Sequence, residues 1–292
     1  MRILISNVYV YTGNEVKKGY IYIDKDKIAD IGYNKEFPIE YGFSELHYTF
    51  KNNAIVFRGL SIAITPSLYP CRGSIKCIDY SIFSKDEIRA FIVSSFYDLL
   101  MKGVTLPIVF NELYLDLLYD VIRSYKLKSI IIIEEEDYID KFLHVKEVTV
   151  CTTSKDLSNK YSIPYMDRSS ICSLEEIDNE NCKIVYMKDL YLPQYIFIYR
   201  HIYGRDIRSL LFSGYSLVSE TYNIKINTPA DLIIYKLDKI IRVPLLKTDP
   251  LSIIARGFSP DLVIQSGEVV VEENENYIII ERNLLKNLKI II

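Results

Sequence analysis

The chain has 292 residues, of which 49% are hydrophobic and 25% are charged, and its formal net charge is −3. These values are typical of a globular protein with a sizeable core, built as one large domain or as a barrel with a small additional domain. The weak negative charge, without a basic cluster, argues against nucleic acid or an anionic membrane as a partner.

The beginning of the chain runs directly into a strand pattern and lacks the apolar segment of a secretory signal. The longest apolar runs, such as Ser129–Ile133, are too short to span a bilayer. We therefore expect a cytoplasmic protein with no membrane partner. The abundance of Ile, Tyr and Lys and the absence of Trp point to an AT-rich or thermophilic source.

The cysteines are scattered along the chain without a C-x-x-C pair, which favours small buried hydrophobic residues over a metal site. In a thermophile, an internal disulfide would be less unusual than in other cytosolic proteins. The five are Cys71, Cys77, Cys151, Cys172 and Cys182.

Short strand patterns separated by turn residues occur at both ends of the chain. An isolated hairpin is only marginally stable in water, so we expect the two ends to build one small sheet together. In the later segment, Gln265–Glu268 has the composition of a hairpin turn. The strand patterns are Ile3–Ile5, Tyr20–Ile23, Ile28–Ile31, Leu232–Tyr235, Leu262–Ile264 and Val269–Val271.

Strand and helix patterns alternate in the middle of the chain, which is typical of βαβ units around a parallel sheet. Ser84 and Glu87 form a capping box that begins a helix, and Gly103 follows its end. The other predicted helices are Glu112–Tyr125, Glu134–Leu143, Leu192–Tyr203 and Asp206–Glu220. The predicted strands are Ile55–Thr65, Val104–Phe110, Lys128–Ile133, Val145–Cys151, Ser162–Met166 and Lys183–Met187, with little helix between the last two.

The opening residues 1–32, with the pattern G-x-I-x-I from Gly19 and a closing Ile31-Gly32, resemble the start of amidohydrolase-superfamily enzymes. The similarity is to the branch of cytosine and guanine deaminases and imidazolonepropionases. Residues 230–271 resemble the return of that family to the same sheet, and MKGVTLPIVF (residues 101–110) resembles its first barrel helix and second strand.

The resemblance implies an α/β protein with a composite β-sandwich domain, residues 1–54 and 223–292, and a TIM-like (β/α) barrel, residues 55–222. Complete barrels rarely have fewer than about 200 residues. We therefore expect a shortened or incomplete barrel with fewer than eight strands, which lacks units mainly after the fourth.

In the resembling family, the first barrel strand ends P-G-x-x-D-x-H-x-H and supplies two histidines to a metal site. The matching run here is Arg58–Pro66: Gly59 is kept, but Ile62 replaces the aspartate, and Ile64 and Pro66 occupy the histidine positions. These side chains cannot coordinate a cation. We expect no metal and no other cofactor. The three histidines of the chain, His47, His144 and His201, are far apart in sequence.

Three other residues are weak catalytic candidates. Asp189 is at the position that best matches the last-strand aspartate of the family, although it also fits a solvated loop. Asp167, beside Arg168, follows a strand pattern and also fits a surface ion pair. Cys71 lies near Arg72 and Lys76, which would lower a thiol pKa, but it also fits a small buried residue. The acidic run Glu134–Asp137 is typical of a helix N-terminus.

Two functional hypotheses follow. The first is a non-catalytic pseudoenzyme that binds a partner or a small ligand. The alternative is a hydrolase of carbon–nitrogen bonds other than peptide bonds, such as a deaminase or cyclic amidase, with an atypical site. A truncated barrel would expose apolar surface, so we expect a homodimer or a heteromer with a related subunit. The predicted surface is 192–203 and 206–220, with Leu210 and Phe212 among its apolar residues.

Overall fold

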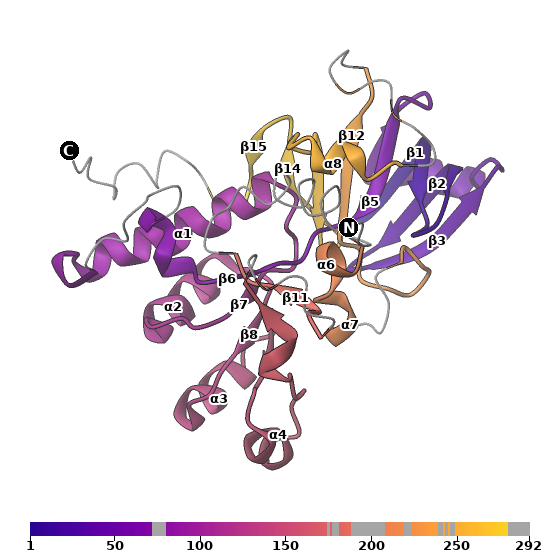
Figure 1. Cartoon of the computed structure of the whole chain (residues 1–292). Helices are drawn as coiled ribbons and strands as arrows, with labels where there is room; N and C mark the ends of the chain where they lie inside the picture. The colour runs from indigo at the N-terminus through magenta and orange to yellow at the C-terminus, as the bar shows by residue number, and fades with distance from the viewer. Residues whose placement is uncertain are drawn as a thin grey trace.

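The structure is a computed structural model that describes residues 1–71, 80–173, 176, 181–187, 208–218, 223–238, 242, 245 and 249–279. Its strands form a nine-stranded sheet, a four-stranded parallel sheet and a two-stranded parallel sheet. Figure 1 shows the large sheet on one side of the molecule and the parallel strands with their helices on the other. The protein is therefore a mixed α/β structure.

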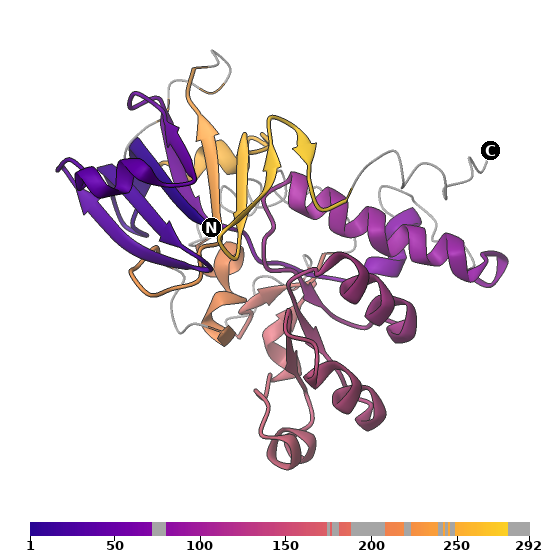
Figure 2. The same cartoon turned by 180° about the vertical axis from the view of Figure 1, so that it is seen from behind.

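Both ends of the chain contribute to the nine-stranded sheet, whose order is β15-β14-β13-β12-β5-β1-β2-β3, with β4 also paired to β1. The central pairing is antiparallel, between β5 near the beginning of the chain and β12 near its end. The prediction that the two ends share one sheet is thus confirmed (Figures 1 and 2). The strands are β1 (Arg2–Tyr11), β2 (Val16–Asp24), β3 (Lys27–Tyr33), β4 (Leu46–Thr49), β5 (Ala54–Arg58), β12 (Leu232–Lys236), β13 (Leu262–Gln265), β14 (Glu268–Glu272) and β15 (Glu275–Asn276).

The predicted hairpin between β13 and β14 is also confirmed, since the two strands are antiparallel. Ser266 and Gly267 both have positive φ, at 51° and 76°, as the two central residues of a type I′ turn require. A Cβ on Gly267 would collide with the carbonyl oxygen of Lys25 in the β2–β3 turn. Apolar residues of β1 to β3 and of β12 and β13 share one hydrophobic cluster, so the sheet curves around a common core.

The parallel strands alternate with helices, as expected. Parallel pairing runs in the order β6-β7-β8-β9, and Figure 1 shows α1 to α4 arranged in succession beside these strands. The bounds are β6 (Ala63–Ile64), α1 (Lys85–Met101), β7 (Ile108–Val109), α2 (Leu115–Tyr125), β8 (Ser129–Ile132), α3 (Glu136–Leu143), β9 (Val148–Cys151) and α4 (Lys155–Tyr161). Ser84 caps α1 through the predicted capping box with Glu87.

Further parallel pairings occur after β9, and one of them reaches β6. Thr152 bridges to Tyr165, β10 (Ile171–Cys172) pairs with β11 (Ile184–Val185), and Tyr186 bridges to Ala63. Cys172 and Cys182 form a disulfide beside β10 and β11. Cys151 is a free buried thiol, and burial raises its pKa to about 12.

The expected strand Ile55–Thr65 is divided between the two sheets, because β5 joins the large sheet and β6 the parallel one. β5 ends just before Gly59, where a Cβ would collide with the side chain of Thr105. Helix α4 lies between the predicted strands Val145–Cys151 and Ser162–Met166, where no element was predicted. The predicted helix Asp206–Glu220 is interrupted into α6 (Arg208–Phe212) and α7 (Tyr215–Val218), and Leu192–Tyr203 lies outside the described residues.

The remaining elements are short. They comprise the 3-10 helices η1 (Ile39–Phe43), η2 (Pro66–Cys71), η3 (Tyr80–Ile82) and η4 (Arg168–Ser170), together with α8 (Ser252–Ala255). In the part of the chain that the structure describes, no helix is both long and apolar enough to cross a membrane.

Candidate functional site

The carboxyl ends of the parallel strands are the first place to look for a site, since ligands of parallel α/β folds bind at this edge. The residues that follow β6, β7 and β11 meet there. Thr65 follows β6, Phe110 and Glu112 follow β7, and Tyr186 follows β11. We call this group the strand-end cluster.

Hydroxyl groups connect three members of the strand-end cluster. The Thr65 hydroxyl donates to the carbonyl oxygen of Phe110 at 2.7 Å. Its only proton is used in that bond, so the Tyr186 hydroxyl, also at 2.7 Å, donates to the Thr65 oxygen. The rings of Phe110 and Tyr186 meet edge to face with centroids 5.5 Å apart. The result is an ordered chain of O–H groups at the ends of β6, β7 and β11.

Glu112 brings a buried carboxyl group to the same edge. Its exposure is 8%, and its two oxygens accept the backbone N–H groups of Ser67 at 3.0 Å and Tyr114 at 2.9 Å. Burial raises the pKa of Glu112, against the opposing effect of these N–H groups. A carboxyl with a raised pKa at a strand end is a candidate proton-transfer group.

Glu112 was missed by the sequence reasoning, which assigned it to the beginning of a helix. That helix starts three residues later, at Leu115, and Asn111 turns the chain with a positive φ of 53°. The available signal was position: Glu112 is the first acidic residue after an apolar strand in a βαβ unit.

A second polar group lies at the ends of the neighbouring strands. Glu134, after β8, accepts a hydrogen bond from Thr153, after β9, and pairs with Arg168 at 3.4 Å. These side chains are exposed or half-exposed. The ion pair considered in the sequence analysis was between Asp167 and Arg168. In the structure, Arg168 pairs with Glu134.

The three candidates from the sequence have different outcomes. Asp167 is exposed and accepts the backbone N–H of Ser169 at 3.0 Å, capping η4, and this bond lowers its pKa. Asp189 and the side chain of Cys71 lie outside the described residues. Their proposed roles, like that of Asp167, stay predictions.

Comparison with known proteins finds similarity in structure but not in sequence. No family model and no curated protein matches the chain. Among solved structures, it is similar to an atrazine chlorohydrolase from Arthrobacter aurescens TC1 complexed with zinc, with a TM-score of 0.70, 11% identity and 98% of both chains covered. It is also similar to an amidohydrolase from an environmental sample of the Sargasso Sea, with a TM-score of 0.69, 10% identity and coverage of 98% of this chain and 96% of that one.

An adenosine deaminase from Xanthomonas campestris with bound zinc gives a TM-score of 0.69 at 11% identity, again covering 98% of this chain and 96% of that one. The chain therefore has the fold of amidohydrolase-superfamily hydrolases, as the resemblance of its two ends indicated. Identities of 10–11% support the fold and nothing finer.

The residues at the family's metal-ligand positions do not fit a zinc ion. Ile64 is completely buried in the hydrophobic core and Ile62 is 1% exposed. Pro66 begins η2, and its carbonyl oxygen accepts the Ser95 hydroxyl at 3.1 Å. None of these side chains carries a donor atom for a metal.

The two histidines within the described residues do not replace the missing ligands. His47 lies on β4 of the large sheet and hydrogen-bonds Ser6 at 3.0 Å, His144 follows the end of α3, and His201 lies outside the described residues. Within the described ranges, no three His, Cys, Asp or Glu side chains converge as a metal site would require. In the described residues, the fold shared with these hydrolases is combined with a strand-end cluster of hydroxyls and one carboxyl.

Proposed function

We propose that this protein is a hydrolase that acts on carbon–nitrogen bonds other than peptide bonds, with Glu112 as its acid–base group. The observation that carries the proposal is the buried, hydrogen-bonded carboxyl of Glu112 at the carboxyl ends of the parallel strands. It has added weight because the fold is shared with hydrolases.

The position of Glu112 suits proton transfer. The backbone N–H groups of Ser67 and Tyr114 each bind one of its two oxygens, which holds the carboxyl in one orientation. A raised pKa brings the group closer to neutral pH, where a general base must alternate between its two forms.

In the proposed reaction, the carboxylate of Glu112 removes a proton from water as the water oxygen bonds to the substrate carbon. On substrate binding, the Tyr186 hydroxyl turns from the Thr65 oxygen to the substrate atom that gains negative charge, whereas the Thr65 hydroxyl keeps its bond to Phe110. When the C–N bond breaks, the protonated carboxyl returns its proton to the leaving nitrogen. No step in this sequence involves the positions of Ile64 and Pro66.

The test is hydrolysis by the purified protein of a panel of adenosine, an aminotriazine, an aminopyrimidine and a cyclic amide, with ammonia release or ring opening measured. Glu112→Gln is expected to lower kcat/KM by about 10²–10⁴-fold, the usual contribution of a positioned general base. Glu147→Gln, at the opposite ends of the parallel strands, is the matched control and should keep full activity. Turnover that survives in Glu112→Gln would refute the assignment.

A second candidate is a non-catalytic protein that binds a partner or a small ligand. It is favoured by Ile64 and Pro66, which place apolar side chains at the two histidine positions of the family motif. This candidate would be supported over the hydrolase if no substrate of the panel is turned over and the purified protein binds a related subunit.

The architecture belongs to the same proposal: a shortened (β/α) barrel from residues 55–222 and a composite β-sandwich from residues 1–54 and 223–292. The parallel pairings that return from β11 to β6 support the barrel, and the shared core of the curved sheet supports the sandwich. We place the protein in the cytoplasm.

We also propose association as a homodimer or with a related subunit, which light scattering after size exclusion would test. The predicted surface is wrong in one respect, because Leu210 and Phe212 are buried within the chain.

A further inference from the structure

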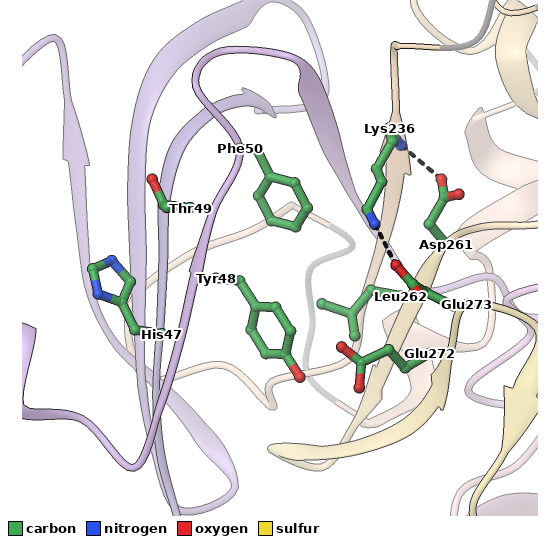
Figure 3. Close-up of a pocket in the computed structure, with 9 residues that line it drawn as sticks. All are labelled: His47, Tyr48, Thr49, Phe50, Lys236, Asp261, Leu262, Glu272 and Glu273. Atoms are coloured by element: carbon green, nitrogen blue, oxygen red, sulfur yellow. Dashed lines mark hydrogen bonds and ion pairs between the residues drawn. The ribbon is translucent and has the colours of Figure 1, made fainter.

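A pocket of about 310 Å³ opens in the large sheet, beside the connection between β4 and β5 (Figure 3). It arises from the pairing of β4, β5 and β12. β4 pairs with the first half of β1 and β5 with the second half, whereas β12 pairs with β5 and ends at Lys236, opposite Ala54. β12 therefore does not continue alongside β4, and the pocket lies in the space between them.

Two aromatic rings form one wall of the pocket. Tyr48 and Phe50 are two residues apart in an extended segment, so both side chains point to the same side. Their rings are nearly parallel, at 13°, with centroids 6.4 Å apart. Figure 3 shows both rings projecting toward Leu262 and Glu272 on the opposite wall. A ligand here would contact aromatic side chains on one side.

The opposite wall is charged, and most of its charges are already compensated. The Lys236 ammonium pairs with Glu273 at 2.8 Å. Asp261 accepts the backbone N–H of Lys236 at 2.7 Å and pairs with Arg242. Its carboxylate is thus directed at groups of the protein.

Glu272 differs from these residues. It accepts the Tyr277 hydroxyl at 3.2 Å, but no basic side chain of the described part of the chain forms an ion pair with it. Burial and the charge of Glu272 together raise the pKa of Tyr48 to about 12, which agrees with a carboxylate next to this ring. Among the described residues, Glu272 therefore provides a negative charge without a basic partner beside the aromatic wall.

We propose that this pocket binds a small organic ammonium ion that carries an apolar or aromatic group, with the cation between Glu272 and the rings of Tyr48 and Phe50. Aromatic faces attract cations, and desolvation strengthens the attraction. The volume is at the lower end of the range for small-molecule sites, about 300–1,000 Å³. A metal ion is a poorer fit, because within the described residues no three acidic groups converge. The site does not depend on Glu112 or on the proposed hydrolase reaction.

Benzylammonium and neutral benzyl alcohol are suitable probes, because they differ mainly in charge. Calorimetric titration of the full-length protein should give saturable binding of benzylammonium at least tenfold tighter than that of the alcohol. Amide NMR shifts should change around Tyr48, Phe50 and Glu272. Glu272→Gln should weaken benzylammonium binding at least tenfold, whereas Glu275→Gln, an exposed carboxylate on β15, should leave it unchanged.

Equal binding of the alcohol, unchanged affinity in Glu272→Gln, or shift changes confined to other regions would overturn the proposal. Circular dichroism checks that the variants fold. If Glu272→Gln does not fold, Tyr48→Leu provides a second test, because loss of the ring should weaken benzylammonium binding and leave the weak binding of the alcohol almost unaltered. Unchanged benzylammonium affinity in Tyr48→Leu would equally overturn the proposal.

Discussion

Asp231 connects three parts of the fold through one buried carboxylate. One oxygen accepts the Lys128 ammonium at 2.6 Å, just before β8, and the other accepts the backbone N–H of Ser266 at 2.7 Å, in the β13–β14 turn. The Asp231 side chain is completely buried and that of Lys128 is 19% exposed. The carboxylate therefore joins the parallel strands to the large sheet, and its removal should destabilise both.

The expected cost follows from these two exposures. Removing one partner of a buried ion pair usually costs about 3–5 kcal/mol, mostly because the other charge stays buried and unpaired. Asp231→Asn should cost about 3 kcal/mol, the lower limit, because Lys128 still reaches solvent. Lys128→Met should cost about 4 kcal/mol, because it leaves a carboxylate without solvent and with one N–H donor.

Urea denaturation followed by circular dichroism gives these free energies, and the double variant tests the coupling. Asp231→Asn with Lys128→Met should cost about 2 kcal/mol less than the sum of the single variants, since neither charge is then left alone. A cost below about 1 kcal/mol for Asp231→Asn, or additivity within about 0.5 kcal/mol, would show that the pair does not hold the two sheets together.

Two further predictions concern pH and the disulfide. The raised pKa of Glu112 means that the folded state holds its proton more tightly, so this stabilisation is complete below the ordinary value of 4.5 and is lost as pH rises through the folded pKa. Urea titrations from pH 4 to 8 should show the wild type losing stability relative to Glu112→Gln; parallel curves would contradict the raised pKa. The Cys172–Cys182 disulfide closes a loop with a sequence separation of 10, so Cys172→Ser should cost about 3 kcal/mol in the oxidised protein. Equal stability of the wild type with and without reductant would contradict this.

The parts of the fold that the sequence predicted well are those governed by local rules. The hairpin turn at Ser266-Gly267 requires residues that tolerate positive φ, and the Ser84–Glu87 capping box fixes the start of α1 through bonds within four residues. Such signals do not depend on the rest of the chain, and they held in the structure.

The features that were missed depend on contacts between distant segments. The apolar run Ile55–Thr65 has the pattern of one strand, yet it divides between two sheets, and Gly59 at the division lies close to Thr105. Glu112 has the pattern of a helix start, but its carboxyl is buried and accepts the backbone N–H of Ser67, which lies in η2 after β6. Sequence periodicity contains neither of these contacts.

The same contacts give a role to two positions at which the resembling family has an aspartate and a histidine. Ile62 and Ile64 occupy the positions of the family's aspartate and first histidine. Here both pack in the hydrophobic core, so they contribute to the stability of the strands. The next polar residue, Thr65, bonds the end of β7 and meets Tyr186, while Ser67 orients Glu112. The polar groups of the strand ends therefore come from the residues after the strands. If this protein catalyses a reaction, its chemistry should respond to changes at Glu112 and Tyr186, and restoring histidines at positions 64 and 66 should destabilise the core without creating activity.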